Sequence, residues 1–117
     1  MEPIFNGHGC TVGWLREDIV FDASGQPSAF IRNGAVFSYS GGYLGRLDRG
    51  IFRDLNGHAV AFMHGASGGP MLPVPAVPPV PPVPQVPPVS PVPVIPPVPP
   101  VPSLSWSLLT WEEFLAG

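Results

Sequence analysis

The sequence predicts an all-β head of four 16-residue β-hairpin repeats about a pseudo-fourfold axis, followed by a polyproline II tail and a short C-terminal aromatic peptide. Three observations lead to this prediction. Five positions repeat every 16 residues from Met1, 17 of the 19 prolines lie in residues 70–102, and three aromatic residues follow the last proline. The expected parts are a four-hairpin head (1–64), a flexible Gly-rich joint (65–72), a Pro-Val-Pro rod (73–102) and an aromatic docking peptide (103–117).

The repeat is seen when residues 1–64 are cut every 16 residues, because no insertion or deletion is needed. The fourth position of each unit is apolar, the sixth is Asn, Asp or Ser, the ninth is Gly, the thirteenth is Gly or Ala, and the fifteenth is aliphatic or Met. In unit order these sets are Ile4, Val20, Val36 and Phe52; Asn6, Asp22, Ser38 and Asp54; Gly9, Gly25, Gly41 and Gly57; Gly13, Ala29, Gly45 and Ala61; and Leu15, Ile31, Leu47 and Met63.

Each unit has the pattern of a β-hairpin. The sixth side chain can accept a hydrogen bond from the backbone two residues on, and the glycine at the ninth position supplies the positive φ of a type I turn followed by a bulge. The flanking strands should contain about four and six residues. Because an isolated hairpin is marginal in water, four hairpins should bury their common faces around a shared axis. The small thirteenth residue then fits where the backbones approach closely.

The repeated Phe/Asp-x-x-Gly segment, carried by Phe21, Asp22, Gly25 and their equivalents, resembles the 4-fold beta flower domain, a small bacterial domain. The resemblance covers residues 1–64 and implies four hairpins about a pseudo-fourfold axis. It carries no catalytic residue over to this chain. Ser38, Arg46 and Arg53 depart from their sibling positions, so we expect the symmetry to be broken on that side.

If odd positions face inward, the side chains that alternate with them form a largely aromatic outer set on the head. These outer residues are Phe5, Phe21, Phe37 and Arg53 from the first strands and Trp14, Phe30, Arg46 and Phe62 from the second. Cross-strand pairing could shelter them, or they could form a surface that another molecule covers. Small domains often depend on such added coverage.

The tail contains ten Pro-Val-Pro-type triplets in residues 73–102. Their centres are Val74, Val77, Val80, Val83, Val86, Val89, Val92, Ile95, Val98 and Val101. Polyproline II has three residues per turn, so these side chains should line one edge of a rod that reaches about 90 Å. The triplets contain no glycine, which excludes collagen. The rod is either a solvated spacer or a packing edge received by an apolar groove.

The last 15 residues change character again. Thr110 and Glu113 have the spacing of a capping box, which predicts one or two helical turns from Trp111. The residues expected to anchor a contact are Trp106, Leu109, Trp111 and Phe114. Two interpretations remain open: the peptide is a lid on its own head, or it docks on another chain.

Composition excludes several classes of function. The net charge is −3, there is no lysine, and the five arginines form no basic cluster, which argues against nucleic acid as a partner. Residues 55–111 carry no charge, but their prolines cannot satisfy a backbone inside a bilayer, so no membrane span is expected. Cys10 is the only cysteine and cannot form an intrachain disulfide. With no signal peptide, a cytoplasmic location is the default, although leaderless export stays open.

No residue cluster predicts chemistry. His8, His58 and His64 have no metal-ligand spacing, the sixth-position oxygens are explained by turn capping, and Cys10 is expected to be a small apolar filler. We therefore expect no enzyme, cofactor or metal. The predicted function is a structural or interaction protein that assembles with itself, as a homo-oligomer or a head-to-tail polymer, or with another protein. The alternative is a binding module whose aromatic head receives a small molecule, a glycan or a proline-rich partner, with the tail as a tether.

Overall fold

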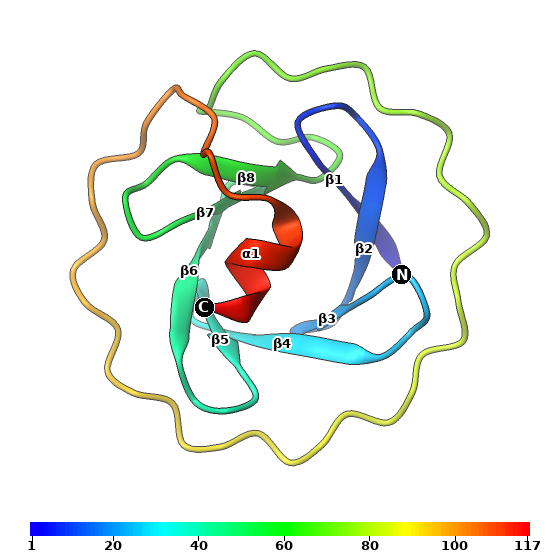
Figure 1. Cartoon of the computed structure of the whole chain (residues 1–117), viewed down its shortest axis with the longest axis vertical. Coiled ribbons are helices and arrows are strands. Elements are labelled where there is room, and N and C mark those ends of the chain that lie inside the picture. The colour runs from blue at the N-terminus through cyan, green and yellow to red at the C-terminus, as the bar shows by residue number, and fades with distance from the viewer.

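A computed structural model describes residues 1–117 and contains eight strands and one short helix. The strands form a closed antiparallel barrel in which every strand pairs with its neighbours in sequence and β1 pairs with β8 (Figure 1). The elements are β1 Glu2–Phe5, β2 Thr11–Arg16, β3 Ile19–Phe21, β4 Pro27–Arg32, β5 Ala35–Ser38, β6 Tyr43–Asp48, β7 Ile51–Arg53, β8 Ala59–Phe62 and α1 Trp111–Ala116. The predicted all-β class and its four hairpins are confirmed.

The hairpins β1–β2, β3–β4, β5–β6 and β7–β8 have the predicted turn chemistry. In the second unit, Asp22 Oδ1 accepts the backbone N–H groups of Ser24 (2.9 Å) and Gln26 (3.0 Å), and Gly25 has φ +89°. A register shift follows in each hairpin, at the place where the sequence predicts a bulge. In each turn the sixth-position side chain accepts the backbone hydrogen bonds, and the ninth-position glycine supplies the positive φ.

The links between hairpins are also tight turns, a feature absent from the predicted arrangement of separate hairpins. Asn33 and Gly34 have φ of +51° and +80°, and Arg49 and Gly50 have +50° and +80°. Two residues with positive φ form a type I′ turn, whose twist matches that of the flanking strands. Adjacent hairpins are therefore hydrogen-bonded to each other as well, and the four units close into one barrel without separate blades.

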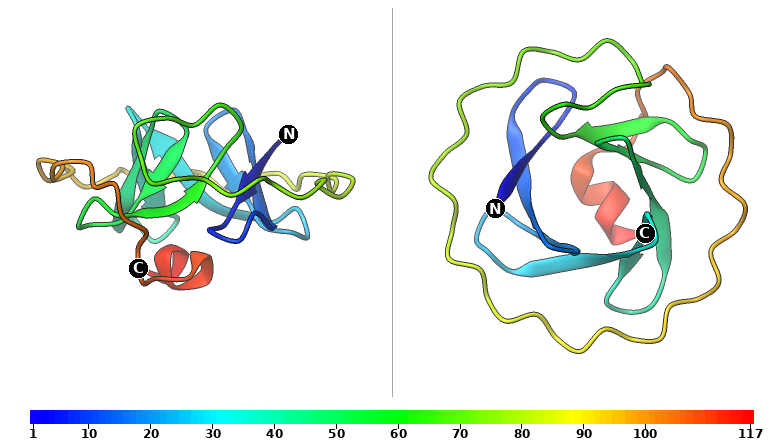
Figure 2. Two further views of the ribbon diagram at one scale, coloured as in Figure 1. Left: turned by 90° about the horizontal axis from the view of Figure 1, so that it is seen from above. Right: turned by 180° about the vertical axis from the view of Figure 1, so that it is seen from behind.

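The inward positions form the core. The four residues at the fourth position are fully buried, and they pack with the thirteenth- and fifteenth-position side chains in one apolar cluster. Trp111 and Phe114 of α1 belong to the same cluster. The helix lies across one end of the barrel, as the side view in Figure 2 shows, so the last residues of the chain close its core.

Candidate interaction surface

The proline-rich tail does not extend away from the barrel. It runs once around the outside of the barrel, and we call residues 73–102 the hoop (Figure 1). The whole molecule measures 36 × 36 × 21 Å. The expectation of a straight rod of about 90 Å is therefore wrong about the path of the tail. The tail bends around the barrel because the barrel offers it repeated attachment points.

Those attachment points are the turns of the hairpins. The backbone N–H groups of Ala76, Gln85 and Ser103 donate to the carbonyls of Gly9 (2.9 Å), Gly25 (2.9 Å) and Gly57 (3.1 Å). Proline has no N–H to donate, so a non-proline residue is needed at each contact. At Gly41, the equivalent glycine of the third hairpin, the nearest hoop atom to an added Cβ would be Pro91 Cγ at 4.0 Å, and no backbone bond forms there.

The spacing of these contacts follows the fourfold head. Ala76 and Gln85 are nine residues apart, and Ser103 follows after two further steps of nine. Nine residues are three turns of polyproline II, so each step returns the same side of the chain to the barrel. Three steps of nine residues at about 3.1 Å per residue span about 84 Å. This is about three quarters of the circumference of a circle with a diameter of 36 Å, as expected when the four positions are spaced a quarter of a circuit apart.

The valine edge of the hoop faces away from the barrel. All ten triplet centres are 85–95% exposed, whereas several of the prolines between them are half-buried. Of the two interpretations left open by the sequence, a valine edge packed in a groove of its own head is therefore not what the structure has. The barrel holds the hoop through backbone groups and proline rings, which leaves a continuous outward line of β-branched side chains.

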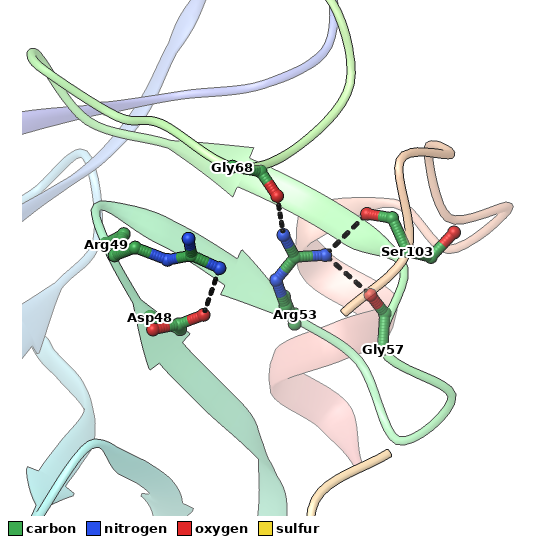
Figure 3. Close-up of polar contacts among 6 residues, drawn as sticks. All are labelled: Asp48, Arg49, Arg53, Gly57, Gly68 and Ser103. Atoms are coloured by element: carbon green, nitrogen blue, oxygen red, sulfur yellow. Dashed lines mark hydrogen bonds and ion pairs between the residues drawn. The ribbon is translucent and has the colours of Figure 1, made fainter. Parts of the chain in front are cut away.

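Arg53 holds the chain on both sides of the hoop, at Gly68 before it and at Ser103 directly after it (Figure 3). One guanidinium nitrogen, Nη1, donates to the carbonyls of Gly57 and Ser103 (2.7 Å each), and Nη2 donates to that of Gly68 (2.8 Å). Arg53 is only 4% exposed, and burial lowers the pKa of its guanidinium, with Asp48 raising it and Arg49 lowering it. The fourth hairpin has Arg53 where the other three have Phe. This arginine acts as a clasp that holds the segments before and after the hoop to one hairpin.

The C-terminal peptide is a lid on its own barrel in this structure, which is one of the two interpretations left open by the sequence. Ser105 and Ser107 hydrogen-bond the backbone of Ala59, and Ser107 Oγ donates to Asp54 Oδ2 (2.5 Å). The capping box is confirmed, because Thr110 Oγ1 accepts from Glu113 N and the Glu113 side chain accepts from Thr110 N. Helix α1 then places Trp111 against Phe52, with ring centroids 5.1 Å apart.

The outer set of the head is mostly covered by the same chain. Seven of its eight members are buried, and Arg46 is half-buried. They meet as cross-strand pairs at the seams between hairpins, for example Phe30 and Phe37 with centroids 5.5 Å apart. Among the C-terminal anchors, Trp111 and Phe114 are buried, Trp106 is half-buried against Phe62, and Leu109 is 42% exposed. These rings stabilise the monomer, and most offer no free surface.

The remaining candidate residues are dispersed. The sixth-position oxygens accept backbone N–H groups in all four turns. Burial acts to raise the pKa of Asp22, but hydrogen bonds from the Ser24 side chain and from neighbouring backbone N–H groups outweigh it and hold this pKa below its usual value. Burial raises the pKa of Tyr39. Cys10 is exposed, which corrects its expected role as an apolar filler. No three His, Cys, Asp or Glu side chains come together.

Replacing Gln85 with proline tests how the hoop is held. The change removes the N–H that reaches Gly25, and we expect a loss of about 1 kcal/mol and a thermal midpoint lower by several degrees. Val86→Pro is the matched control, because the Val86 N–H makes no hydrogen bond and its side chain is 92% exposed. Both prolines restrict the unfolded chain equally, so the difference between the two melting temperatures isolates the bond. Equal melting temperatures would contradict the attachment.

The fold defines a class of small all-β repeat proteins. Its members have a closed barrel of four equal hairpins that is encircled by the proline-rich tail of the same chain. A family model described as "4-fold beta flower protein" matches residues 2–115, and the chain belongs to this family. The match extends beyond residue 64, where the resemblance was expected to end, so it includes the hoop and nearly all of the lid. No curated protein and no solved structure matches the chain. The one helix is too short to cross a bilayer.

Proposed function

We propose that this protein is a structural or interaction protein rather than an enzyme, and that it associates with further copies through the outer face of the hoop. The observation that carries the proposal is the outward line of ten β-branched side chains, each 85–95% exposed. Contiguous exposed apolar surface of this kind marks interaction sites in soluble proteins. The beta flower fold, moreover, is not that of a known enzyme family.

Charge and spacing favour a second copy as the partner. Residues 55–111 contain no Asp, Glu, Lys or Arg, so two hoops can meet without charge repulsion. Side chains three residues apart on polyproline II recur about every 9 Å, and a second hoop has the same spacing by identity. The valines of one hoop therefore fit between those of another.

The shape of the hoop sets the form of the assembly. Two convex rims touch over a small area, well below the roughly 1,600 Å² of a standard interface, so one contact is weak. The rim runs around the whole barrel, however, and one molecule can contact several neighbours. We therefore expect assemblies that grow with concentration. In a head-to-tail polymer, the tail of one copy encircles the barrel of the next. The contacts between hoop and barrel then form between two chains instead of within one, which requires the 65–72 joint to open.

The alternative of a binding module with an aromatic head surface has less support. Seven of the eight residues proposed for that surface are buried within the chain. A partner would have to displace the cross-strand pairs before it could reach the rings.

The proposal is tested by changing the ten triplet centres to threonine. Threonine keeps the branched shape, and the prolines keep the backbone conformation, so only the polarity of the rim changes. We expect the wild-type mass measured by light scattering to rise with protein concentration, while the threonine variant stays monomeric with an unchanged circular-dichroism spectrum. Leu108→Thr is the control, because Leu108 is fully exposed but lies outside the hoop. A monomeric wild type at millimolar concentration would overturn self-association and direct the search to a partner with a concave, aromatic-lined groove.

A further inference from the structure

The seam between β6 and β7 differs from the other three seams of the barrel. At each of the others, the directly opposed outer residues are two aromatic side chains. These pairs are Trp14 with Phe21, Phe30 with Phe37, and Phe5 with Phe62. At the β6–β7 seam, the opposed residues are Arg46 and Arg53. Two cations therefore occupy the place where each of the other seams has two opposed aromatic residues.

Neither arginine of this pair forms an ion pair with a carboxylate. Like charges directly opposite each other on a sheet are destabilising. Asp48 pairs with Arg49 at 3.4 Å, and both carboxylate oxygens of Asp54 accept hydrogen bonds from the turn and from Ser107. The neighbouring acids are thus already engaged elsewhere.

Both arginines also keep unused donors. Arg53 is 4% exposed, and its Nε is buried with no hydrogen-bond partner. Arg46 makes one long contact, from Nη2 to the carbonyl of Asn33 at 3.4 Å. An unpaired buried donor is costly, so the seam is energetically incomplete without an acceptor.

The same two arginines line a cavity of about 440 Å³ between the seam and the hoop. Its other walls are Asp48, Asp54, Gly57 and the hoop segment Pro99, Pro100, Val101 and Pro102. The volume lies within the range of small-molecule pockets. At the aromatic β2–β3 seam, the equivalent cavity is smaller, about 260 Å³, and contains Arg16 beside Glu17.

We infer that this cavity binds a small organic carboxylate, whose anionic group is held by Arg46 and Arg53 and whose apolar body lies against the prolines of the hoop. Guanidinium groups recognise carboxylates through paired N–H donors. Asp48 is paired with Arg49, and Asp54 offsets one of the two guanidinium charges, so a single negative charge fits the cavity better than a dianionic phosphate. The inference goes beyond the proposed self-association, and of the valine edge it involves only Val101.

Titration of the full-length protein with benzoate, followed by amide chemical shifts, tests the inference. We expect saturable shifts centred on Gly57 and Val101, much weaker shifts with the neutral isostere benzamide, and weaker binding of inorganic phosphate. Arg46→Gln should weaken benzoate binding at least tenfold while the protein stays folded, because Arg46 makes only one long hydrogen bond.

The matched control is Arg16→Gln, which changes an arginine in the cavity of an aromatic seam and should leave benzoate binding unchanged. Equal shifts with benzamide, no saturable shifts with benzoate, or equal weakening by Arg16→Gln would each overturn the inference. A threonine variant of the hoop that keeps Val101 should still bind benzoate, because the other nine changed side chains do not line the cavity. Failure of self-association and failure of this site are therefore distinguishable.

Discussion

Replacement of Arg53 with alanine is expected to lower the thermal midpoint by more than 10 °C and to free both ends of the hoop. The side chain bonds three backbone carbonyls, those of Gly57, Gly68 and Ser103, from a position that is 4% exposed. Hydrogen bonds to a charged group contribute about 1.5–3 kcal/mol each, and the carbonyls of Gly68 and Ser103 lose their donor. Because these losses are not fully additive, we expect a total of about 3–5 kcal/mol.

Calorimetry and amide hydrogen exchange measure the two parts of this result. The N–H of Ser103, which bonds Gly57, should exchange faster in Arg53→Ala, as should the hoop N–H of Ala76. Arg53→Lys retains the charge but not the planar fork, so it should fall between alanine and wild type. The control is Arg16→Ala, an exposed arginine that should change the midpoint by less than two degrees. If Arg53→Ala also melted within two degrees of wild type, Arg53 would not be the clasp.

The head could be predicted from its sequence because its determinants are local. A turn such as Asp22 to Gly25 needs an oxygen acceptor and a residue with positive φ at fixed spacing. Both residue types can be identified from the sequence alone. The inward positions follow from alternation along each strand. The repeat pattern alone does not predict the closure of the barrel, which depends on the turns at Asn33-Gly34 and Arg49-Gly50 that connect neighbouring hairpins. Asn-Gly is a strong signal for such a turn, so this part was available in the sequence.

The sequence contains a signal for the circular path of the tail, which the prediction of an extended rod does not use. The first residue of each triplet is proline except at Ala76, Gln85 and Val94, and Ser103 continues the series. This spacing of nine places a free N–H at one side of the chain four times, once for each hairpin. Three of the four make the bond to a turn glycine. The valines at every third position form a more conspicuous pattern, but they lie on the face of the tail that does not contact the barrel.

The outer residues show what sequence reasoning could not supply. Alternation placed Phe5, Phe30 and Phe62 outside the barrel wall, which is correct, but burial also depends on what covers the wall. The cover comes from cross-strand pairing at the seams and from Leu72 and Trp106, which are distant in sequence. Arg53 is a similar case. The sequence shows it only as a break in the repeat, because its role as a clasp depends on the carbonyls of Gly68 and Ser103, which are distant in sequence.

Gly45→Val is expected to be the most damaging single change in the barrel. A Cβ at Gly45 would collide with the carbonyl oxygen of Arg53 and lie 2.8 Å from Cε1 of Phe114. The first contact is with the backbone of the neighbouring strand, which cannot rotate away, and the second is with the helix that closes the core. Overpacking costs about 1–3 kcal/mol when side chains can adjust, so we expect more than 3 kcal/mol here. This is a large share of the roughly 5–15 kcal/mol that stabilises a small protein.

A graded series separates the contact with the strand from the contact with the helix. Gly13 occupies the same repeat position, but an added Cβ there would lie 2.9 Å from Phe21 O and 3.4 Å from Trp111 Nε1. Gly13→Ala should therefore destabilise less than Gly45→Ala, and Gly45→Val should destabilise most. If Gly45→Val displaces α1 before the barrel unfolds, the emission of Trp111 will shift to the red while the β-sheet signal persists. A Gly45→Val protein with the wild-type midpoint and emission would show that neither the wall nor the lid is closely packed at this position.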